Sequence, residues 1–177
     1  MMVARTPLAQ SVLVKALAAH DVEREYLALC EGLVTGGGTI AEPIGRHRTQ
    51  RTRMVVRADG REAITHYRIE HRYAAHTLLR VRLETGRTHQ IRVHLTHVGH
   101  PIVGDPVYGG RRRLPAGATP TVIAALQSFE RQALHAARLQ FAHPKSGRSM
   151  SFETPLPVDF RNLLAAIDGA PLSARRK

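Results

Sequence analysis

Several residue types that define whole classes of protein are scarce or missing in this chain of 177 residues. It has one cysteine, Cys30, which excludes an internal disulfide and a metal cluster built from cysteines. It has no apolar run of membrane-spanning length and no signal-peptide pattern, so we expect a cytoplasmic protein without a membrane partner. Hydrolysis of the P-loop type is also excluded, because no Lys-Ser/Thr pair follows the glycines at 36–38 at the required spacing.

Acidic residues are scarce as well. The chain has 14 of them against 26 lysines and arginines, which leaves a formal net charge of +12. Most of the positive charge is arginine, whose guanidinium binds phosphate with two donors and stacks on bases, so the composition indicates a nucleic-acid partner. A generally basic surface with no such partner is the alternative. Hydrophobic residues at 43% are enough for one globular core.

Hydrophobic periodicity and turn residues predict an α+β fold with a mixed, mainly antiparallel sheet flanked by a few helices. Asp59-Gly60 is a hairpin signal between 54–56 and the strand that follows it. We expect one domain over 1–168 and a basic, disordered tail over 169–177. Helices are expected near 7–20, 87–98, 120–131 and 157–167, and strands near 24–31, 54–56, 63–73, 77–83, 134–143 and 149–153.

The richest segment runs from Leu83 to Gly110, with the sequence LETGRTHQIRVHLTHVGHPIVGDPVYGG. Its helix places Arg92 near its own N-terminus, where a guanidinium and free backbone N–H groups form a site for a carboxylate or a phosphate. Arg87 stands at the entry, and Gln90 both donates and accepts. An amphipathic helix with solvated arginines is an equally valid interpretation of these residues.

Histidines and a tyrosine need separate consideration. The four histidines of this segment (His89, His94, His97 and His100) have no nearby cysteine to complete a zinc set, so we expect no metal site.

Tyr26 lies in the expected strand 24–31, where a half-buried aromatic is the ordinary interpretation. In basic surroundings, the other interpretation is a ring that stacks on a flipped base. The run 46–53 (RHRTQRTR) is too charged for a buried strand and is expected on a loop or a sheet edge.

The ordered motifs of the chain resemble those of one enzyme family. GRTHQIRVH followed by GHPIVGDPVYGG is similar to the signature of ribosomal large-subunit pseudouridine synthases of the RluA/RluD type. REYLALCEG, TGGGTIAEPIGRHRTQRTRM, ITHYRI, RQALHAARLQFAHPKSG and FETPLP follow in the order expected for that family. The resemblance covers about residues 1–166. It implies isomerisation of uridine to pseudouridine in RNA, most directly large-subunit ribosomal RNA, with no cofactor.

The resemblance also implies roles for individual residues. Tyr26 of REY matches the tyrosine that stacks on the base and takes part in proton removal. Arg92 of QIR matches the basic partner of a catalytic aspartate, and Ile91 beside it walls the base pocket. The remaining residues expected to bind the RNA are Arg87, His89, Gln90, Arg46, Arg48, Arg51 and Arg53.

One family motif has no match in the chain. The catalytic aspartate of the family sits in an HRLD-type motif, and none of the five aspartates present has that context. We therefore expect an N-terminally truncated, monomeric catalytic domain that is inactive alone, in which Arg92 lacks its carboxylate partner. Two alternatives stay open: an RNA-binding module without catalysis, and a fragment of a longer active synthase whose reading frame was started too late.

Overall fold

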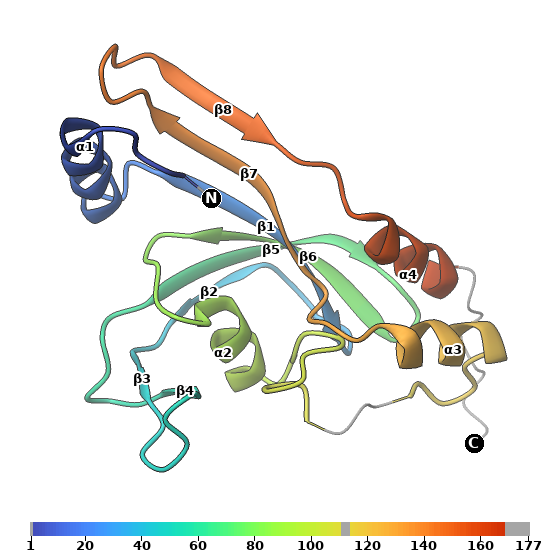
Figure 1. Ribbon diagram of the computed structural model, residues 1–177. Coiled ribbons are helices and arrows are strands. Elements are labelled where there is room, and N and C mark those ends of the chain that lie inside the picture. The colour runs from blue at the N-terminus through green and yellow to red at the C-terminus, as the bar shows by residue number, and fades with distance from the viewer. Residues whose placement is uncertain (1, 111–113, 169–177) are drawn as a thin grey trace.

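A twisted six-stranded sheet forms the body of the computed structural model, which describes residues 2–110 and 114–168 (Figure 1). Every strand pair is antiparallel, and the strands are ordered β2-β5-β6-β1-β7-β8. The expected α+β class with a mainly antiparallel sheet is therefore confirmed. The strands of this sheet are β1 (Glu23–Glu31), β2 (Gly38–Ala41), β5 (Ile64–Arg72), β6 (His76–Leu83), β7 (Leu134–Ala142) and β8 (Ser149–Glu153).

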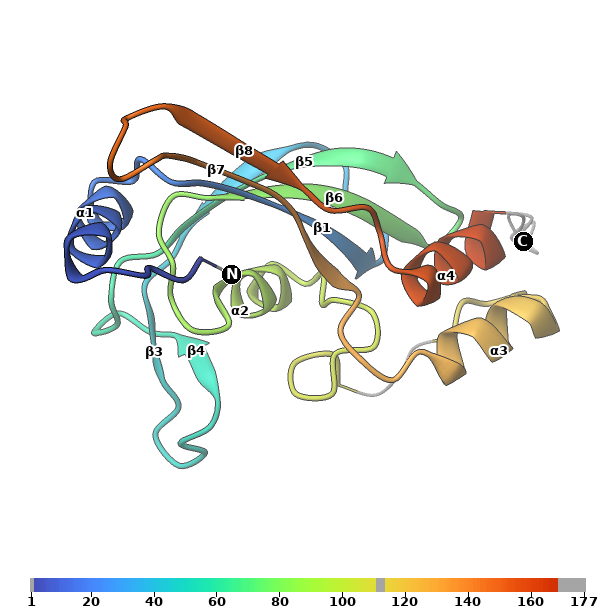
Figure 2. The same cartoon turned by 45° about the horizontal axis from the view of Figure 1, so that its top comes forward.

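A separate two-stranded ribbon, β3 (Ile44–Arg46) and β4 (Met54–Val56), extends away from this sheet beside α2 (Figure 2). The Asp59-Gly60 turn forms, but the hairpin expected between 54–56 and the next strand does not. Arg61 instead exchanges backbone hydrogen bonds with Ile44 at 2.8 and 2.9 Å, so the turn wraps around β3 and β4 pairs with β3. Gly60 is needed at this turn, because a Cβ there would lie 2.6 Å from the backbone carbon of Ile44.

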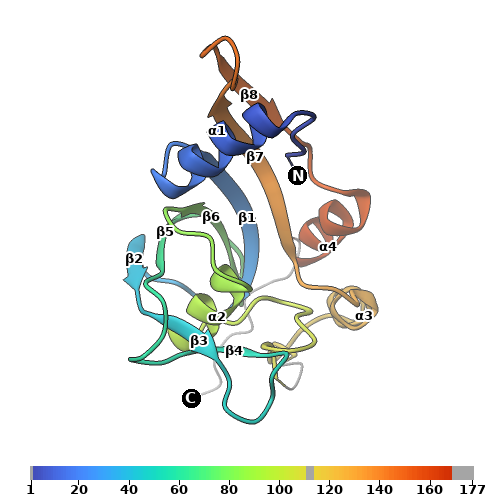
Figure 3. The same cartoon turned by 60° about the vertical axis from the view of Figure 1, so that its left-hand side comes forward.

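Four helices accompany the sheet: α1 (Pro7–Ala18), α2 (Gln90–His97), α3 (Pro120–Ser128) and α4 (Val158–Asp168). The Thr6 side chain caps α1, and the Thr119 side chain caps α3, each just before a proline at the first turn. Gly99, at φ +86°, follows the end of α2 as its sequence position suggested. Viewed from the side, α1 lies at the β7–β8 end of the sheet, and α2 lies beside the β3–β4 ribbon (Figure 3). None of the described helices is long and apolar enough to cross a membrane.

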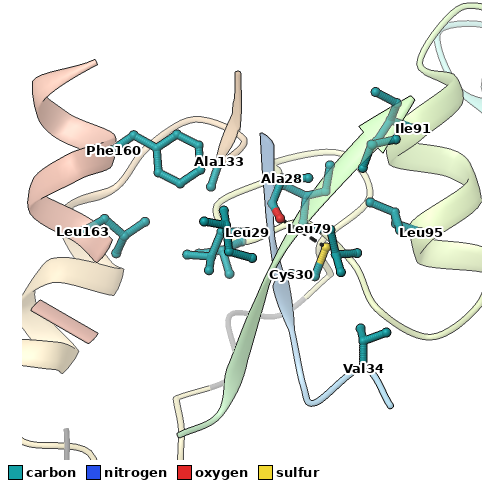
Figure 4. Close-up of a cluster of buried hydrophobic side chains, with 14 of the residues drawn as sticks. Ala28, Leu29, Cys30, Val34, Leu79, Ile91, Leu95, Ala133, Phe160 and Leu163 are labelled. Atoms are coloured by element: carbon teal, nitrogen blue, oxygen red, sulfur yellow. Dashed lines mark hydrogen bonds between the residues drawn. The ribbon is translucent and has the colours of Figure 1, made fainter. Parts of the chain in front are cut away.

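The hydrophobic core lies on both faces of the central strands. Phe160 and Leu163 of α4 pack on one side of β1 and β6, next to Leu29 (Figure 4). Ile91 and Leu95 of α2 pack on the other side. The central strands are thus covered on both faces, and α2 packs against one of them. The expected tail at 169–177 lies outside the described residues.

Candidate RNA-binding site around helix α2

Tyr26 lies on the face of the sheet that α2 covers. It pairs with Val81 of β6 and with Ala136 of β7, and it is half-buried against the main core. Side chains alternate between the two faces of a strand, so Tyr26 shares a face with Ala28, two residues further on. Leu29, the next residue, lies on the side of β1 that α4 covers, next to Phe160 and Leu163, so Ala28 points to the opposite side, where Ile91 and Leu95 of α2 pack (Figure 4). The structure thus places Tyr26 and the helix that carries Arg92 on the same side of the sheet.

The N-terminus of α2 is anchored by Gln90, which is 2% exposed. Its Oε1 accepts from the Thr85 hydroxyl and the Arg87 backbone N–H, both at 2.9 Å. Its Nε2 donates to the Ile64 carbonyl at 2.9 Å and to Thr65 Oγ1 at 3.0 Å. All the hydrogen-bonding capacity of the amide is used inside the protein. The amide of Gln90 therefore ties α2 to β5, and the expected contact of Gln90 with RNA stays a prediction.

Arg92 is also buried, and its partner is Asp105. Its Nε and Nη2 donate to Asp105 Oδ2 and Oδ1, each at 2.7 Å. The Asp105 side chain is fully buried, and its Oδ1 also accepts from the backbone N–H groups of Val107 and Tyr108. The expectation that Arg92 lacks a carboxylate is wrong, because the loop after α2 folds back and brings Asp105 onto the guanidinium. Asp105 uses one edge of the guanidinium, and the two Nη1 hydrogens point away from this pair.

The charges of this pair are strongly favoured. Burial alone raises the pKa of the Asp105 carboxyl, but the hydrogen bonds from Arg92 and the two backbone amides outweigh it and hold the pKa below its usual range. The hydrogen bonds that Arg92 donates to Asp105 in turn raise the pKa of Arg92. A fixed, charged guanidinium on α2 is therefore part of the folded structure before any ligand binds.

Tyr108 connects α2 to the β3–β4 ribbon. Its hydroxyl lies 2.9 Å from the backbone nitrogen of Met54 in β4 and 2.9 Å from Nδ1 of His89. The guanidinium carbons of Arg92 and Arg53 lie 4.7 and 5.4 Å from the centroid of its ring, within the range of cation–π contacts. Tyr108 is 6% exposed, so the ring is enclosed by these groups and by the small core of the ribbon.

His89 precedes α2 in the left-handed conformation, at φ +57°, and its side chain does not cap the helix. Burial, and next the charge of Arg92, lower the pKa of His89. Arg87, half-buried beside it, donates from Nε to the Glu62 carbonyl at 2.8 Å. Ile91, at 4% exposed, packs in the main core; its role as a wall of a base pocket stays a prediction.

The arginine-rich run forms the loop of the β3–β4 ribbon, as expected for so charged a segment. Arg46, Arg48 and Arg51 are exposed, and Arg53 is half-buried against Tyr108. The ribbon and the N-terminus of α2 are neighbours, because Tyr108 binds both. The positive charge of the loop therefore extends the positive charge of Arg92 toward solvent.

The other histidines of the segment differ in burial. His94 is fully buried; its ring is hydrogen-bonded to Thr65 Oγ1 and to the Glu42 carbonyl, both at 2.8 Å. His97 is exposed, and His100 Nδ1 lies 3.0 Å from the Glu31 carbonyl. Within residues 2–110 and 114–168, no group of three or more His, Cys, Asp or Glu side chains could hold a metal ion.

Two residues of this arrangement, Asp105 and Tyr108, were not assigned to the site from the sequence. The GDPVYGG motif that contains them was visible, but a stretch of glycine and proline gives no period from which a direction in space could be read. Gly104, at φ +72°, makes the reversal that turns Asp105 toward α2, and a Cβ at Gly104 would lie 2.3 Å from the Arg131 carbonyl.

Away from this site, a groove of about 900 Å³ lies between α1 and the β7–β8 end of the sheet. Its lining is mainly apolar and includes Leu8, Leu13, Phe141 and Phe152. Leu8 is 71% exposed and Phe152 is 50% exposed, so this groove is open to solvent. None of the residues expected to act in the site lines the groove, and its apolar character does not suit a polyanion.

The sequence and the fold of this chain match those of a known family. A family model described as RNA pseudouridylate synthase matches residues 1–97, which is more than half of the chain. The chain belongs to this family, so the resemblance found in its motifs is confirmed.

Individual relatives agree. The ribosomal large subunit pseudouridine synthase D of Xanthomonas campestris pv. campestris is 54% identical over 167 residues, which are 94% of this chain and 50% of that protein. The protein of the same name from Escherichia coli K12 is 53% identical over 164 residues, which are 93% of this chain and 50% of that protein. The chain thus spans about half the length of these curated relatives.

Solved structures show the same fold. Human RNA pseudouridylate synthase domain containing 1 superposes with a TM-score of 0.72 at 26% identity, covering 93% of this chain and 66% of that one. Human RNA pseudouridylate synthase domain containing 4 superposes with a TM-score of 0.68 at 21% identity, covering 88% of this chain and 66% of that one.

Proposed function

We propose that this chain is the uridine-binding part of an enzyme that isomerises uridine to pseudouridine in large-subunit ribosomal RNA. The observation that carries the proposal is the buried Arg92, held by Asp105 on the face of the sheet that also carries Tyr26. The family supports the reaction, and the relatives named ribosomal large subunit pseudouridine synthase D support the substrate.

The reaction is an isomerisation, so the RNA has the same atoms before and after it. The N1–C1′ bond breaks, the base turns, and a C5–C1′ bond forms; the proton of C5 is lost and N1 gains a proton. Tyr26 would stack on the base and take part in removing the C5 proton. Arg92 would offer its Nη1 edge to an anionic group, since Asp105 already holds the other edge. No cofactor takes part in the proposed reaction.

RNA binding would depend on positive charge around this pocket. Arg46, Arg48 and Arg51 reach solvent from the β3–β4 loop, where they would neutralise phosphates, and Arg53 lies between the loop and Tyr108. Arg87 and His89 stand at the entry to α2, where they would contact the nucleotide bound beside Arg92.

We propose that this chain by itself binds RNA without turnover, because it contains no HRLD-type aspartate. One observation favours a non-catalytic RNA-binding module in particular: the carboxylate that pairs with Arg92 is Asp105 of the GDPVYGG segment and not an HRLD-type aspartate. Losing a catalytic group costs many orders of magnitude in rate, whereas the charges that bind RNA are present.

Tritium release from ribosomal RNA labelled at C5 of uridine tests this, with the Escherichia coli relative as the positive control. We expect salt-dependent RNA binding by the chain and no release above background. Robust release by the purified chain would sink the proposal of inactivity, and absence of RNA binding would overturn the proposed function.

We further propose that residues 1–168 act as one domain, that it is monomeric and that it works in the cytoplasm, where ribosomal RNA is found. The continuous six-stranded sheet that runs from β1 to β8 supports a single domain. Limited proteolysis should leave one core fragment, and light scattering should give the mass of a single chain. Two separately stable fragments, or a mass that doubles with concentration, would contradict these proposals.

A further inference from the structure

The hydroxyl of Tyr108 is fully committed to two partners on different elements. The backbone nitrogen of Met54 lies 2.9 Å from it, and Nδ1 of His89 lies 2.9 Å from it on the other element. A backbone N–H only donates, so the phenolic oxygen accepts from Met54. The phenol has one hydrogen of its own, and among the described residues the acceptor found for that hydrogen is Nδ1 of His89.

The number of donors and acceptors at this contact favours one position for the proton of His89. When the phenolic O–H donates to Nδ1, Nδ1 is unprotonated, and the single ring proton of a neutral imidazole lies on Nε2. The opposite tautomer would place the Nδ1 hydrogen on the phenolic oxygen and leave the buried phenolic hydrogen without a partner, which is costly. The lowered pKa of His89, caused by burial and by Arg92, agrees with a neutral ring.

We propose that Tyr108 is a positioning residue that fixes His89 as the Nε2–H tautomer, so that His89 donates a hydrogen bond to an acceptor oxygen of the RNA. The identity of the ligand rests on the proposed function; the tautomer does not. Three features direct Nε2 toward a ligand. The ring is half-buried, it does not cap α2, and among the described residues no partner is found for Nε2.

The surroundings of His89 suit an electron-rich oxygen. Arg92 follows three residues later, and its guanidinium lies over the ring of Tyr108 at 4.7 Å. Asp105 is the one carboxylate of this cluster, and both of its oxygens are used by Arg92 and the loop amides. The acceptor would be a phosphate oxygen, a base carbonyl or a 2′-hydroxyl, all of which RNA offers.

The same contact links the ribbon to the helix. Met54 begins β4 directly after the arginine-rich loop, so RNA that moves this loop also acts on the hydrogen bond that sets the tautomer of His89. Tyr108 thereby connects phosphate binding by the ribbon with the donor at the entry of α2.

Nuclear magnetic resonance of the full chain with ¹⁵N-labelled histidine rings tests the first half of the proposal without RNA. At neutral pH we expect His89 Nε2 to be protonated and Nδ1 unprotonated. Tyr108→Phe keeps the ring and its contacts with Arg53 and Arg92 but removes the hydroxyl, so His89 should become a mixture of tautomers. Tyr73→Phe, the same change far from His89, should leave its signals unaltered. An unaltered single tautomer in Tyr108→Phe would overturn the proposal.

The second half is tested by adding a short uridine-rich RNA oligonucleotide and the DNA oligonucleotide of the same sequence. We expect RNA to shift the His89 Nε2 signal, and His89→Asn, which tolerates the left-handed backbone, to weaken binding roughly three- to tenfold. Tyr108→Phe should weaken binding by a similar factor, and the two changes together by little more, because they remove one unit. A shift with RNA alone identifies the 2′-hydroxyl; a shift with both identifies a phosphate or base oxygen.

Failure of this inference differs from failure of the proposed function. RNA that binds the chain but leaves Nε2 unmoved overturns the donor role of His89 while the function stands. RNA that does not bind at all overturns the function, and the tautomer of the free protein still decides the role of Tyr108.

Discussion

Arg92 and Asp105, thirteen residues apart in the chain, form a bidentate ion pair whose two N···O distances are both 2.7 Å. The pair joins α2 to the loop that follows it, inside a site where the Asp105 carboxylate is fully buried. A buried charge without its partner is strongly unfavourable, so the pair must form for either residue to fold where it does.

Asp105→Asn is expected to lower the free energy of unfolding by about 3 kcal/mol or more, because it leaves the Arg92 charge buried without a counter-charge. Urea denaturation at neutral pH measures the loss. Asp59→Asn is the matched control: Asp59 pairs with Arg57 but is exposed, so its loss should lower the free energy of unfolding far less than the loss of Asp105. Equal losses in the two variants would show that the buried pair has no special weight.

Gly104→Ala is expected to destabilise the protein by about 2 kcal/mol or more. The residue has φ +72°, and its new Cβ would lie 2.3 Å from the Arg131 carbonyl, so strain and overlap add. Gly147→Ala has the same left-handed strain, at φ +69°, but open space around the Cβ, and should cost about 1 kcal/mol. Thermal and urea unfolding of both variants separate the backbone strain from the steric overlap. A smaller loss of stability in Gly104→Ala than in Gly147→Ala would contradict the close approach.

Stability should fall as the pH drops below about 6.5. Burial lowers the pKa of His94 below the ordinary value for histidine, about 6.5, and it also lowers the pKa values of His76 and His89. As the pH falls, these histidines are therefore protonated in the unfolded chain at a higher pH than in the folded chain. The contribution of each histidine is complete above about 6.5 and is lost as the pH falls toward its folded pKa, at no more than about 1.4 kcal/mol per pH unit for each group.

Urea denaturation at a series of pH values between about 7.5 and 5 measures this slope. His94→Gln should lower stability at neutral pH and flatten the slope, since one buried titrating ring is gone. A stability that stays constant, or rises, on acidification would show that these histidines are protonated in the folded protein.

Replacing Arg46, Arg48 and Arg51 by glutamine should reduce the salt dependence of RNA binding. Each lost phosphate contact lowers the slope of log K against log salt by roughly 0.7 for a single strand. A variant with the same change of charge elsewhere, at the exposed Lys15, Arg148 and Arg161, should keep most of the slope. Fluorescence anisotropy over a range of salt concentrations measures both. Equal slopes would show that the ribbon has no particular part in binding RNA.

The sequence by itself was sufficient to predict helices and strands where the signal is local. Thr6-Pro7 and Thr119-Pro120 open helices, alternation marks β6 and β7, and Gly99 follows the end of α2, because caps, periods and left-handed glycines act within a few residues. The ordered motifs also identified the family. The arginine-rich run was assigned correctly to a loop, because so many like charges exclude burial.

Tertiary structure decided the pairings between distant residues. The partner of β4 is β3, because the turn at Asp59-Gly60 wraps around Ile44, and no local period records such a contact. Likewise the family resemblance implied a carboxylate partner for Arg92, but the sequence did not show that Asp105 supplies it, because an irregular loop had to reverse at Gly104 first. Interactions between residues close in sequence determined the helices, the strands and the positive charge. Which charged residues pair was decided only by the tertiary fold, which buries them together.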